Sequence, residues 1–296
     1  MIKKKEITYL DLKEKLKNPV TCYCGLDPTA DSLHIGHLQQ VFLLRRYQLA
    51  GHKPIALCGG ATGMIGDPRP TTERKLLTLE DVAYNVECIK KQVSRFIDFN
   101  DDKALLLNNY DWLGKMSLLD FLRVYGKHFN VSYMIAKDTI ASRLSTGISF
   151  TEFTYTILQA ADWLHLYQNY GCDLQIGGSD PWGNLVSGVD LIRKVCGENS
   201  KVYGVTSPLI TKSDGSKFGK SEGGNVWLDA DKTSPYEFYQ FLINISDDDI
   251  INMLKKLSFE TREEIERLEI EVKERPHLRE AQKVLAKELA LLVHGQ

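Results

Sequence analysis

The chain has 296 residues, of which 43% are hydrophobic and 26% charged, and its formal net charge is -2 at pH 7. This composition is typical of a soluble globular enzyme of roughly two domains, and the charge excludes the overall basic character of many nucleic-acid-binding proteins. No apolar run is long enough to span a membrane, and the six cysteines are too scattered for a disulfide scaffold, so we expect a cytoplasmic protein.

The first predicted elements are a short amphipathic helix near residues 10–16 and a buried strand that is broken by Asp27 and Pro28. Ser32 is a good N-cap residue, and Gly51 is a typical C-terminal stop. The sequence therefore predicts a helix that begins after Ser32 and runs to Gly51.

The start of this helix carries two histidines, His34 and His37, with Gly36 between them. Free backbone N–H groups and the helix dipole favour an anion at a helix start, so we expect a phosphate to bind there. Two alternatives remain open. The histidines could be ordinary surface or core-edge residues, or they could bind zinc together with Cys22 and Cys24.

The next predicted strand, residues 54–58, leads into a glycine-rich loop at residues 59–68. The glycines of such a loop let the backbone approach a ligand closely. Asp67, at the end of the loop, is either a helix-capping residue or a ligand carboxylate. The segment that follows is basic and is typical of a solvated loop; its cations are Arg69, Arg74 and Lys75.

Helical spacing returns over residues 79–98, and residues 104–107 form another short apolar strand. Residues 112–143 are predicted to be helical and are rich in aromatic side chains, with Gly147 closing the segment. Strands that alternate with helices in this way predict an α/β fold with a parallel sheet wrapped by helices.

Residues 151–171 form a helix that we expect to be buried nearly all round. Its polar side chains Tyr155, Gln159 and Asp162 are spaced to lie on one face. A buried carboxylate without a partner is strongly unfavourable. This face is therefore either an internal hydrogen-bond network or the wall of a pocket for a polar small molecule.

A further strand, residues 174–180, ends in glycines and in Asp180. In an open parallel sheet, ligands bind at the carboxyl ends of the strands, so Gly25, Gly59 and Gly178 should converge there. Asp180 is well placed to accept hydrogen bonds from a ribose. A helix at residues 185–195 and a strand at residues 202–209 complete the predicted sheet.

Residues 212–224 form a glycine-rich loop that carries Lys217 and Lys220. We expect this lysine loop to be mobile and its cation pair to be suited to phosphates. The remainder is predicted to be helical, over residues 235–244, 247–257, 261–273 and 278–294. Residues 255–296 hold nine basic and nine acidic side chains and therefore offer no electrostatic footprint for RNA.

Together these motifs resemble one family closely. His34-Ile35-Gly36-His37 and Lys217-Phe218-Gly219-Lys220-Ser221 are similar to the two signatures of class I aminoacyl-tRNA synthetases. The resemblance is narrowed to the bacterial-type tyrosyl-tRNA synthetases by three further stretches: Tyr23-Cys24-Gly25 with Asp27-Pro28-Thr29, Phe153-Thr154-Tyr155 with Gln159-Ala160 and Asp162, and residues 174–180 with Trp182-Gly183-Asn184.

The resemblance implies a Rossmann-like catalytic domain over residues 1–224 and a helical domain over residues 225–296. Within the catalytic domain it implies a helical insertion at about residues 110–150, which would mediate homodimerisation. Phe150 is expected at that dimer contact, and residues 212–224 are expected to form the mobile lysine loop.

The resemblance also implies roles for individual residues. Tyrosine would be bound through its hydroxyl by Tyr23 and Asp162 and elsewhere by Asp67, Tyr155, Gln159 and Gln175. The phosphates would be stabilised by Thr29, His34, His37, Lys217 and Lys220. The nucleotide would be contacted by Cys24, Gly25, Asp27, Gly36, Gly178, Asp180 and Ser221, with His37 also near the adenosine.

By the same resemblance, the substrates are L-tyrosine, ATP with Mg²⁺, and tRNA(Tyr), and the protein itself ligates no metal. Pro181 stands where the family usually has glutamine near the substrate carboxylate, so the match is weakest there. Bacterial relatives continue beyond Gln296 into a small RNA-binding domain. We therefore expect this chain to form tyrosyl-adenylate but to transfer tyrosine to tRNA poorly.

Two rival functions belong to other classes. A related nucleotidyl-transferring enzyme, such as tryptophanyl-tRNA synthetase or a cytidylyltransferase-like protein, would have no use for the polar pair Tyr23 and Asp162. A degenerate RNA-binding relative would be expected to lose the signatures that are intact in this chain.

Overall fold

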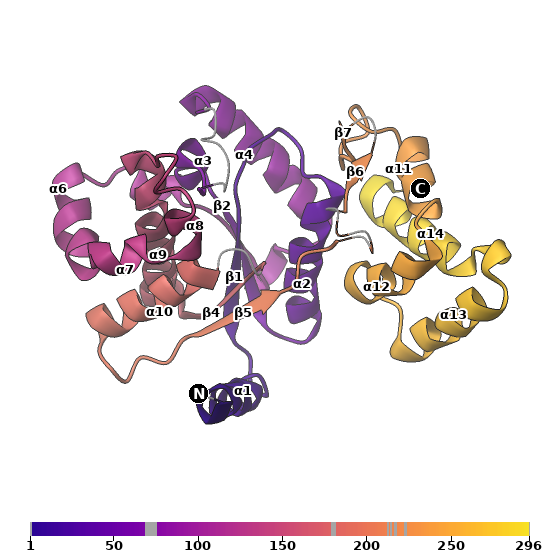
Figure 1. Ribbon diagram of the computed structural model, residues 1–296, viewed down its shortest axis with the longest axis horizontal. Helices are drawn as coiled ribbons and strands as arrows, with labels where there is room; N and C mark the ends of the chain where they lie inside the picture. Colours follow the sequence, from indigo (N-terminus) through magenta and orange to yellow (C-terminus); the bar gives the residue numbers. More distant parts are fainter. Residues whose placement is uncertain are drawn as a thin grey trace. The chain divides into compact units, whose positions relative to one another are not determined.

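The computed structural model describes residues 2–68, 76–178, 182–211, 213, 215, 218–221 and 224–295 (Figure 1). The chain divides into two compact units. The first unit consists of Met1–Asp31, Leu44–Lys90 and Asp98–Pro208, and the second of Ser32–Leu43, Lys91–Ile97 and Leu209–Gln296.

The first unit is built on a parallel sheet of five strands in the order β3-β2-β1-β4-β5. The strands are β1 (Thr21–Leu26), β2 (Lys53–Cys58), β3 (Leu105–Asn108), β4 (Cys172–Gly178) and β5 (Tyr203–Ser207). The chain winds outward from β1 to β3 and then returns to place β4 on the other side of β1. This reversal is the switch point at which α/β sheets bind ligands, and it confirms the predicted Rossmann-like fold.

Long helices pack against this sheet. Helix α9 (Phe150–Tyr170) contacts β4 and α10 (Trp182–Cys196), and α10 also contacts β5. The predicted burial of α9 holds for most of its length, since Trp163 and Leu166 are completely buried, but Gln168, Asn169 and Tyr170 at its end are exposed. Gly171 ends α9 with a φ of +63°, a value that glycine adopts without steric cost. Upstream in the chain are α1 (Ile2–Lys15), α2 (Leu38–Leu49), α3 (Thr62–Ile65) and α4 (Leu79–Val93).

The segment predicted as helical over residues 112–143 is helical, but it is divided into short pieces. These are α5 (Tyr110–Leu113), α6 (Leu118–Asp120), a π-helical turn (Phe121–Tyr125), a 3₁₀ turn (Gly126–His128), α7 (Val131–Ile135) and α8 (Asp138–Ala141). Two polar residues start new helices here: the side chain of Ser117 accepts a hydrogen bond from Asp120 N, and that of Asn130 accepts one from Tyr133 N.

One predicted cap is wrong. Helix α2 is preceded by a 3₁₀ turn (Ile35–His37), and the N-cap of that turn is His34 rather than Ser32. The imidazole of His34 accepts the hydrogen bond from Gly36 N that a serine hydroxyl would normally take, while the Ser32 hydroxyl donates to the carbonyl of Leu33. The predicted stop is confirmed, because α2 ends at Leu49 and Gly51 has a φ of +86°.

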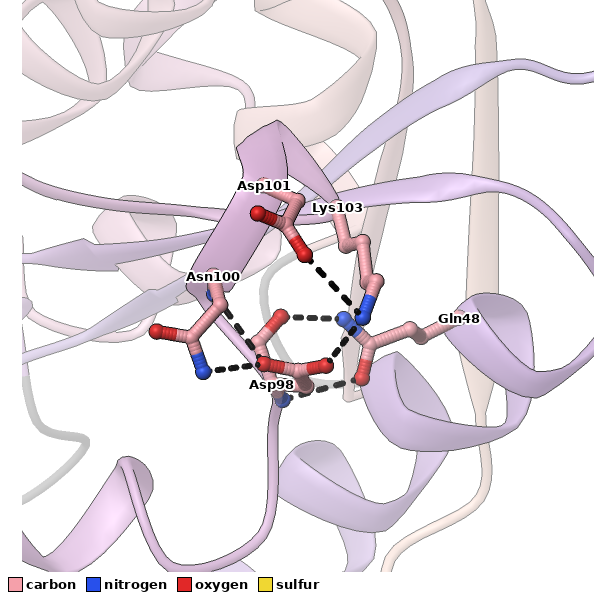
Figure 2. A network of polar contacts seen from close by, with 5 residues as sticks. All are labelled: Gln48, Asp98, Asn100, Asp101 and Lys103. Carbon is pink, nitrogen blue, oxygen red and sulfur yellow. Dashed lines mark hydrogen bonds and ion pairs between the residues drawn. The ribbon is translucent and has the colours of Figure 1, made fainter.

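Figure 2 shows how the end of α2 is tied to the turn that precedes β3. The Gln48 amide donates to the carbonyl of Asp98 (2.6 Å) and accepts from Asp98 N (3.0 Å). The Asp98 carboxylate accepts hydrogen bonds from Asn100 N (3.0 Å) and Lys103 Nζ (2.8 Å). These bonds hold a tight turn in which Asp101 has a φ of +53°, a conformation that Asp tolerates better than most residues.

The second unit is mostly helical, as the sequence predicts. Its elements are β6 (Lys220–Ser221), β7 (Gly224–Asn225), α11 (Pro235–Ile243), α12 (Asp247–Leu257), α13 (Arg262–Glu274) and α14 (Glu280–His294), with a 3₁₀ turn at Pro276–Leu278. A capping box between Ser234 and Glu237 starts α11. The core is formed by completely buried leucines, which include Leu254, Leu268 and Leu285.

Candidate active site

Asp27, which directly follows β1, anchors a buried polar network in the first unit. Its carboxylate accepts one hydrogen bond from the Tyr155 hydroxyl (2.9 Å) and one from Thr62 Oγ1 (3.0 Å). Tyr155 lies on α9, and Thr62 begins α3 in the glycine-rich loop. A Cβ at Gly59 would lie 2.2 Å from Asp27 Oδ1, so the loop can approach Asp27 only because this residue is glycine.

Asp162 lies in the same network and is 3% exposed. Its carboxylate accepts hydrogen bonds from Asn109 Nδ2 (2.9 Å) and from the Trp112 indole N–H (2.8 Å). Burial raises the pKa of Asp162 to about 7, although these two hydrogen bonds act in the opposite direction. Both the neutral and the ionised form of the carboxyl group are therefore populated near physiological pH.

Tyr23, on β1, has a hydroxyl with no hydrogen-bond partner among the described residues, and its side chain is 1% exposed. Burial, and after it the charge of Asp162, raises the pKa of Tyr23 well above its usual value, so the phenol is neutral. A buried hydroxyl without a partner costs about 1–3 kcal/mol. A ligand hydroxyl that bonded to Tyr23 would remove that cost.

A second group of polar side chains gathers around Asn184 on α10. The Asn184 amide donates to Asp67 Oδ1 (3.3 Å) and to Gln159 Oε1 (3.1 Å), and it accepts a hydrogen bond from Thr156 Oγ1 (2.7 Å). No described helix begins at Asp67, and its carboxylate belongs to this cluster.

Lys137, in the insertion, holds the first turn of α10. Its ammonium group donates to the carbonyl of Gly183 (2.9 Å) and to Ser187 Oγ. Burial lowers the pKa of Lys137 to about 8. Lys137 thus fixes the backbone beside Asn184.

Sequence reasoning assigned no role to Asn109, Trp112 and Lys137, and it named Asn184 only as part of the stretch Trp182-Gly183-Asn184. None of them lies on a periodic polar stripe, which was the signal that identified Asp162. The indole of Trp112 gave a usable hint, because a buried Trp N–H usually requires an acceptor.

The remaining predicted residues of this unit lie in strands β1 and β4 or in the turn after β1. Gln175 is 3% exposed and pairs in register with Tyr23 across β1 and β4. The Cys24 thiol is buried, and burial raises its pKa to about 12. Gly25 and Gly178 lie near the carboxyl ends of β1 and β4, and Thr29 is exposed in the turn after Asp27.

The histidine turn of the second unit, residues 34–37, is held by its own side chains. His34 Nδ1 accepts from Gly36 N (3.1 Å), and His37 Nδ1 accepts from His34 N (3.1 Å). The two rings stack with their centroids 3.8 Å apart. In the neutral form each ring therefore carries its hydrogen on Nε2. Burial lowers the pKa of His37 to about 3, which keeps that ring neutral.

The backbone of the histidine turn meets the described part of the lysine loop. A Cβ at Gly219, whose φ is +95°, would lie 2.8 Å from Cγ2 of Ile35. A Cβ at Gly36 would lie 2.9 Å from the His34 ring. Gly219 therefore allows the two motifs to pack closely, and Gly36 leaves room for the His34 ring within its own turn.

Several predicted residues lie outside the described part of the chain: Lys217, Asp180, Pro181, Arg69, Arg74 and Lys75. Lys220 and Ser221 form β6, but their side chains are not described. Within the described ranges, no three His, Cys, Asp or Glu side chains gather as metal ligands. No helix in those ranges combines the length and the apolar character needed to cross a bilayer.

A parallel sheet of this order in the first unit, and in the second unit a histidine turn against which Gly219 of the lysine loop packs, are the features of a class I aminoacyl-tRNA synthetase. The family model of the tRNA synthetases class I (W and Y) matches residues 14–296, and the chain belongs to that family.

The chain is also similar to individual tyrosine–tRNA ligases. The chain is 59% identical to tyrosine–tRNA ligase 1 of Bacillus cereus over 283 residues, which are 95% of this chain and 68% of that protein. It is 58% identical to the tyrosine–tRNA ligase of Staphylococcus carnosus over 282 residues, 95% of this chain and 67% of the relative. Among solved structures, a C-terminally truncated mitochondrial tyrosyl-tRNA synthetase of Aspergillus nidulans matches with a TM-score of 0.81 and 31% identity, covering 96% of this chain and 85% of the other.

Proposed function

We propose that this aminoacyl-tRNA synthetase is a tyrosine–tRNA ligase, which activates L-tyrosine with ATP and transfers it to tRNA(Tyr). The observation that carries the choice of amino acid is the buried pair Tyr23 and Asp162. One is a phenol without a partner, and the other is a carboxylate held by Asn109 and Trp112. An indole has an N–H to donate but no oxygen to accept, so it would leave the Tyr23 hydroxyl without an acceptor, whereas a tyrosine hydroxyl can accept from Tyr23 and donate to Asp162.

The ammonium group of tyrosine is bound by acceptors of the Asn184 and Asp27 clusters. Asp67 supplies the negative charge, and Tyr155 and Gln159 supply neutral oxygen atoms. Asn184 holds Asp67 and Gln159 at their positions, and Asp27 holds the Tyr155 hydroxyl. Gln175 lies in register with Tyr23 and completes the tyrosine side of the site.

Activation is an attack of the tyrosine carboxylate on the α-phosphate of Mg-ATP. The bond from the α-phosphorus to the bridging oxygen breaks, and pyrophosphate departs. The attacking carboxylate is already ionised at neutral pH, so no general base is needed. The step requires alignment and positive charge where the phosphates gain negative charge.

We assign the phosphate contacts to Thr29, His34, His37, Lys217 and Lys220. Hydrogen on Nε2 makes the histidines neutral donors, which stabilise a developing charge without the cost of burying a cation. The lysines add charge, and Mg²⁺ enters with ATP. The nucleotide is contacted by Cys24, Gly25, Asp27, Gly36, Gly178, Asp180 and Ser221.

We further propose a homodimer. The insertion carries large apolar side chains on its surface: Leu118 is 70% exposed, Leu119 69% and Phe150 72%. A patch of this kind is typical of a protein interface, and the family resemblance makes its occupant a second copy of the chain. We also propose a cytoplasmic location, which the six free cysteines support.

The direct test of the proposed activity is ATP–pyrophosphate exchange with each of the twenty amino acids. We expect exchange with tyrosine alone at low substrate concentration. Exchange that is fastest with tryptophan, or that is absent with all twenty, would contradict the proposed function.

A further inference from the structure

Gln92, near the end of α4, is hydrogen-bonded to the two residues that directly precede the histidine turn. It belongs to neither signature motif, and its side chain is 7% exposed. Its Oε1 accepts the backbone N–H of Leu33 (2.8 Å), and its Nε2 donates to Ser32 Oγ (3.0 Å). Because a backbone N–H can only donate, this amide has one possible orientation.

Ser32 links Gln92 to the segment that contains Asp229. Its hydroxyl donates to the Leu33 carbonyl (2.8 Å) and accepts from Gln92 and from Asp229 N (3.2 Å). One hydroxyl hydrogen and two lone pairs are therefore all used. Ser32 is 3% exposed, so water cannot readily replace any of these partners.

The same turn is also bonded to the segment that leads from β7 to Asp229. Ile35 N donates to the Val226 carbonyl and Leu228 N to the Leu33 carbonyl, both at 2.9 Å. The residues on either side of His34 are thus fixed to this segment, and the ring of Trp227 lies edge-on to that of His34 with centroids 6.1 Å apart. Gln92 and Ser32 both hydrogen-bond to the backbone of Leu33, the residue that directly precedes the histidine turn. They therefore fix the point from which the turn begins.

We propose that Gln92 is a positioning residue for adenylate formation, which acts through His34 by fixing the start of the histidine turn. The inference rests on the proposed function, in which His34 contacts the ATP phosphates. Gln92 makes no direct contribution to tyrosine binding in this account. Its loss therefore slows activation and leaves the affinity for tyrosine unchanged.

The test compares Gln92→Met with the matched control Gln282→Met. Gln282 is also a buried glutamine of the second unit; it is 0% exposed and donates to Asp247 Oδ1 (2.7 Å) and the Ile245 carbonyl (3.3 Å). Misplacing a reacting group by about 1 Å can cost about 100-fold in rate. We expect Gln92→Met to slow single-turnover adenylate formation by about 10–100-fold with an unchanged Kd for tyrosine, and Gln282→Met to lower the melting temperature without slowing activation.

A double-mutant cycle with His34→Ala separates positioning from general damage to the fold. If Gln92 acts through His34, then Gln92→Met has almost no further effect on the activation rate of His34→Ala. Ser32→Ala, which breaks the same connection with a smaller change in volume, gives the same result if Gln92→Met does not fold. A full rate for both folded variants, or the same loss with and without His34, would overturn the inference. A His34→Ala variant that itself retained the full rate would instead refute the assignment of His34 in the proposed function.

Discussion

At the residue scale, the chemistry of the site depends on how Asp162 is held. The carboxylate is buried, but it has two good donors in Asn109 and Trp112 and lies near the neutral phenol of Tyr23. Burial outweighs the two hydrogen bonds and raises the pKa to about 7. An amide side chain such as that of asparagine would fill the same space, but the protein has an ionisable acceptor at this position.

This pKa predicts how the affinity for tyrosine depends on pH. The ionised carboxylate accepts the substrate hydroxyl more strongly than the neutral acid does, so binding should weaken as the pH falls below about 7. The loss should approach about tenfold per pH unit, since the ionised fraction falls tenfold per unit below the pKa. Asp162→Asn should bind tyrosine more weakly at pH 8 and with little pH dependence. Equilibrium fluorescence titrations from pH 5.5 to pH 8.5 measure both; a wild-type affinity that is flat over this range would show that Asp162 is ionised throughout.

At the element scale, a buried ion pair fixes the start of α9, the helix that carries Tyr155, Gln159 and Asp162. Arg143 Nη1 lies 3.3 Å from Glu152 Oε2, and the two side chains are 6% and 1% exposed. Arg143 also donates to the carbonyl of Gly147 through Nε (3.2 Å) and Nη2 (3.0 Å). The pair therefore joins the end of the insertion to the first turn of α9.

Removing one partner of this ion pair should lower the free energy of unfolding more than replacing both partners by apolar side chains. Arg143→Met leaves a buried carboxylate unpaired and should lower the free energy of unfolding by about 3–5 kcal/mol. The double variant Arg143→Met with Glu152→Leu should recover most of that loss, because an apolar pair of similar volume is often as stable as a buried ion pair. Urea denaturation at pH 7 measures both. A double variant no more stable than the single one would contradict this account.

The elements that carry the site were largely predictable, and the partners of the site residues were not. Buried apolar runs predicted the parallel strands, and helical spacing with its stop signals predicted α9 and α12, whose predicted and observed ends differ little. The cap at Ser32 was predicted wrongly, because propensity scales do not anticipate that a histidine ring can take that hydrogen bond. The roles of Asn109 and Asn184 were not predicted, because they depend on contacts between segments far apart in the sequence.

At the scale of the whole molecule, the proposed dimer should depend on the apolar patch of the insertion. Phe150→Asp places a charge where an apolar contact is expected and should convert the protein to a monomer at micromolar concentration, as measured by sedimentation velocity. Tyr236→Asp, on α11, is a matched control, since Tyr236 is also 72% exposed but lies in the other unit. A wild-type protein that sediments as a monomer, or a Phe150→Asp variant that remains a dimer, would count against this interface.

In the proposed function, the buried pair Tyr23 and Asp162 selects tyrosine by its hydroxyl group. The most direct test is the ratio of kcat/KM for tyrosine to that for phenylalanine in pyrophosphate exchange, measured for the wild type, Tyr23→Phe and Asp162→Asn. We predict that the ratio falls about 3–10-fold in Tyr23→Phe, where a neutral hydrogen bond is lost, and about 10–100-fold in Asp162→Asn, where the hydrogen bond to a charged acceptor is lost. Ratios equal to that of the wild type in both variants would show that the hydroxyl is recognised elsewhere.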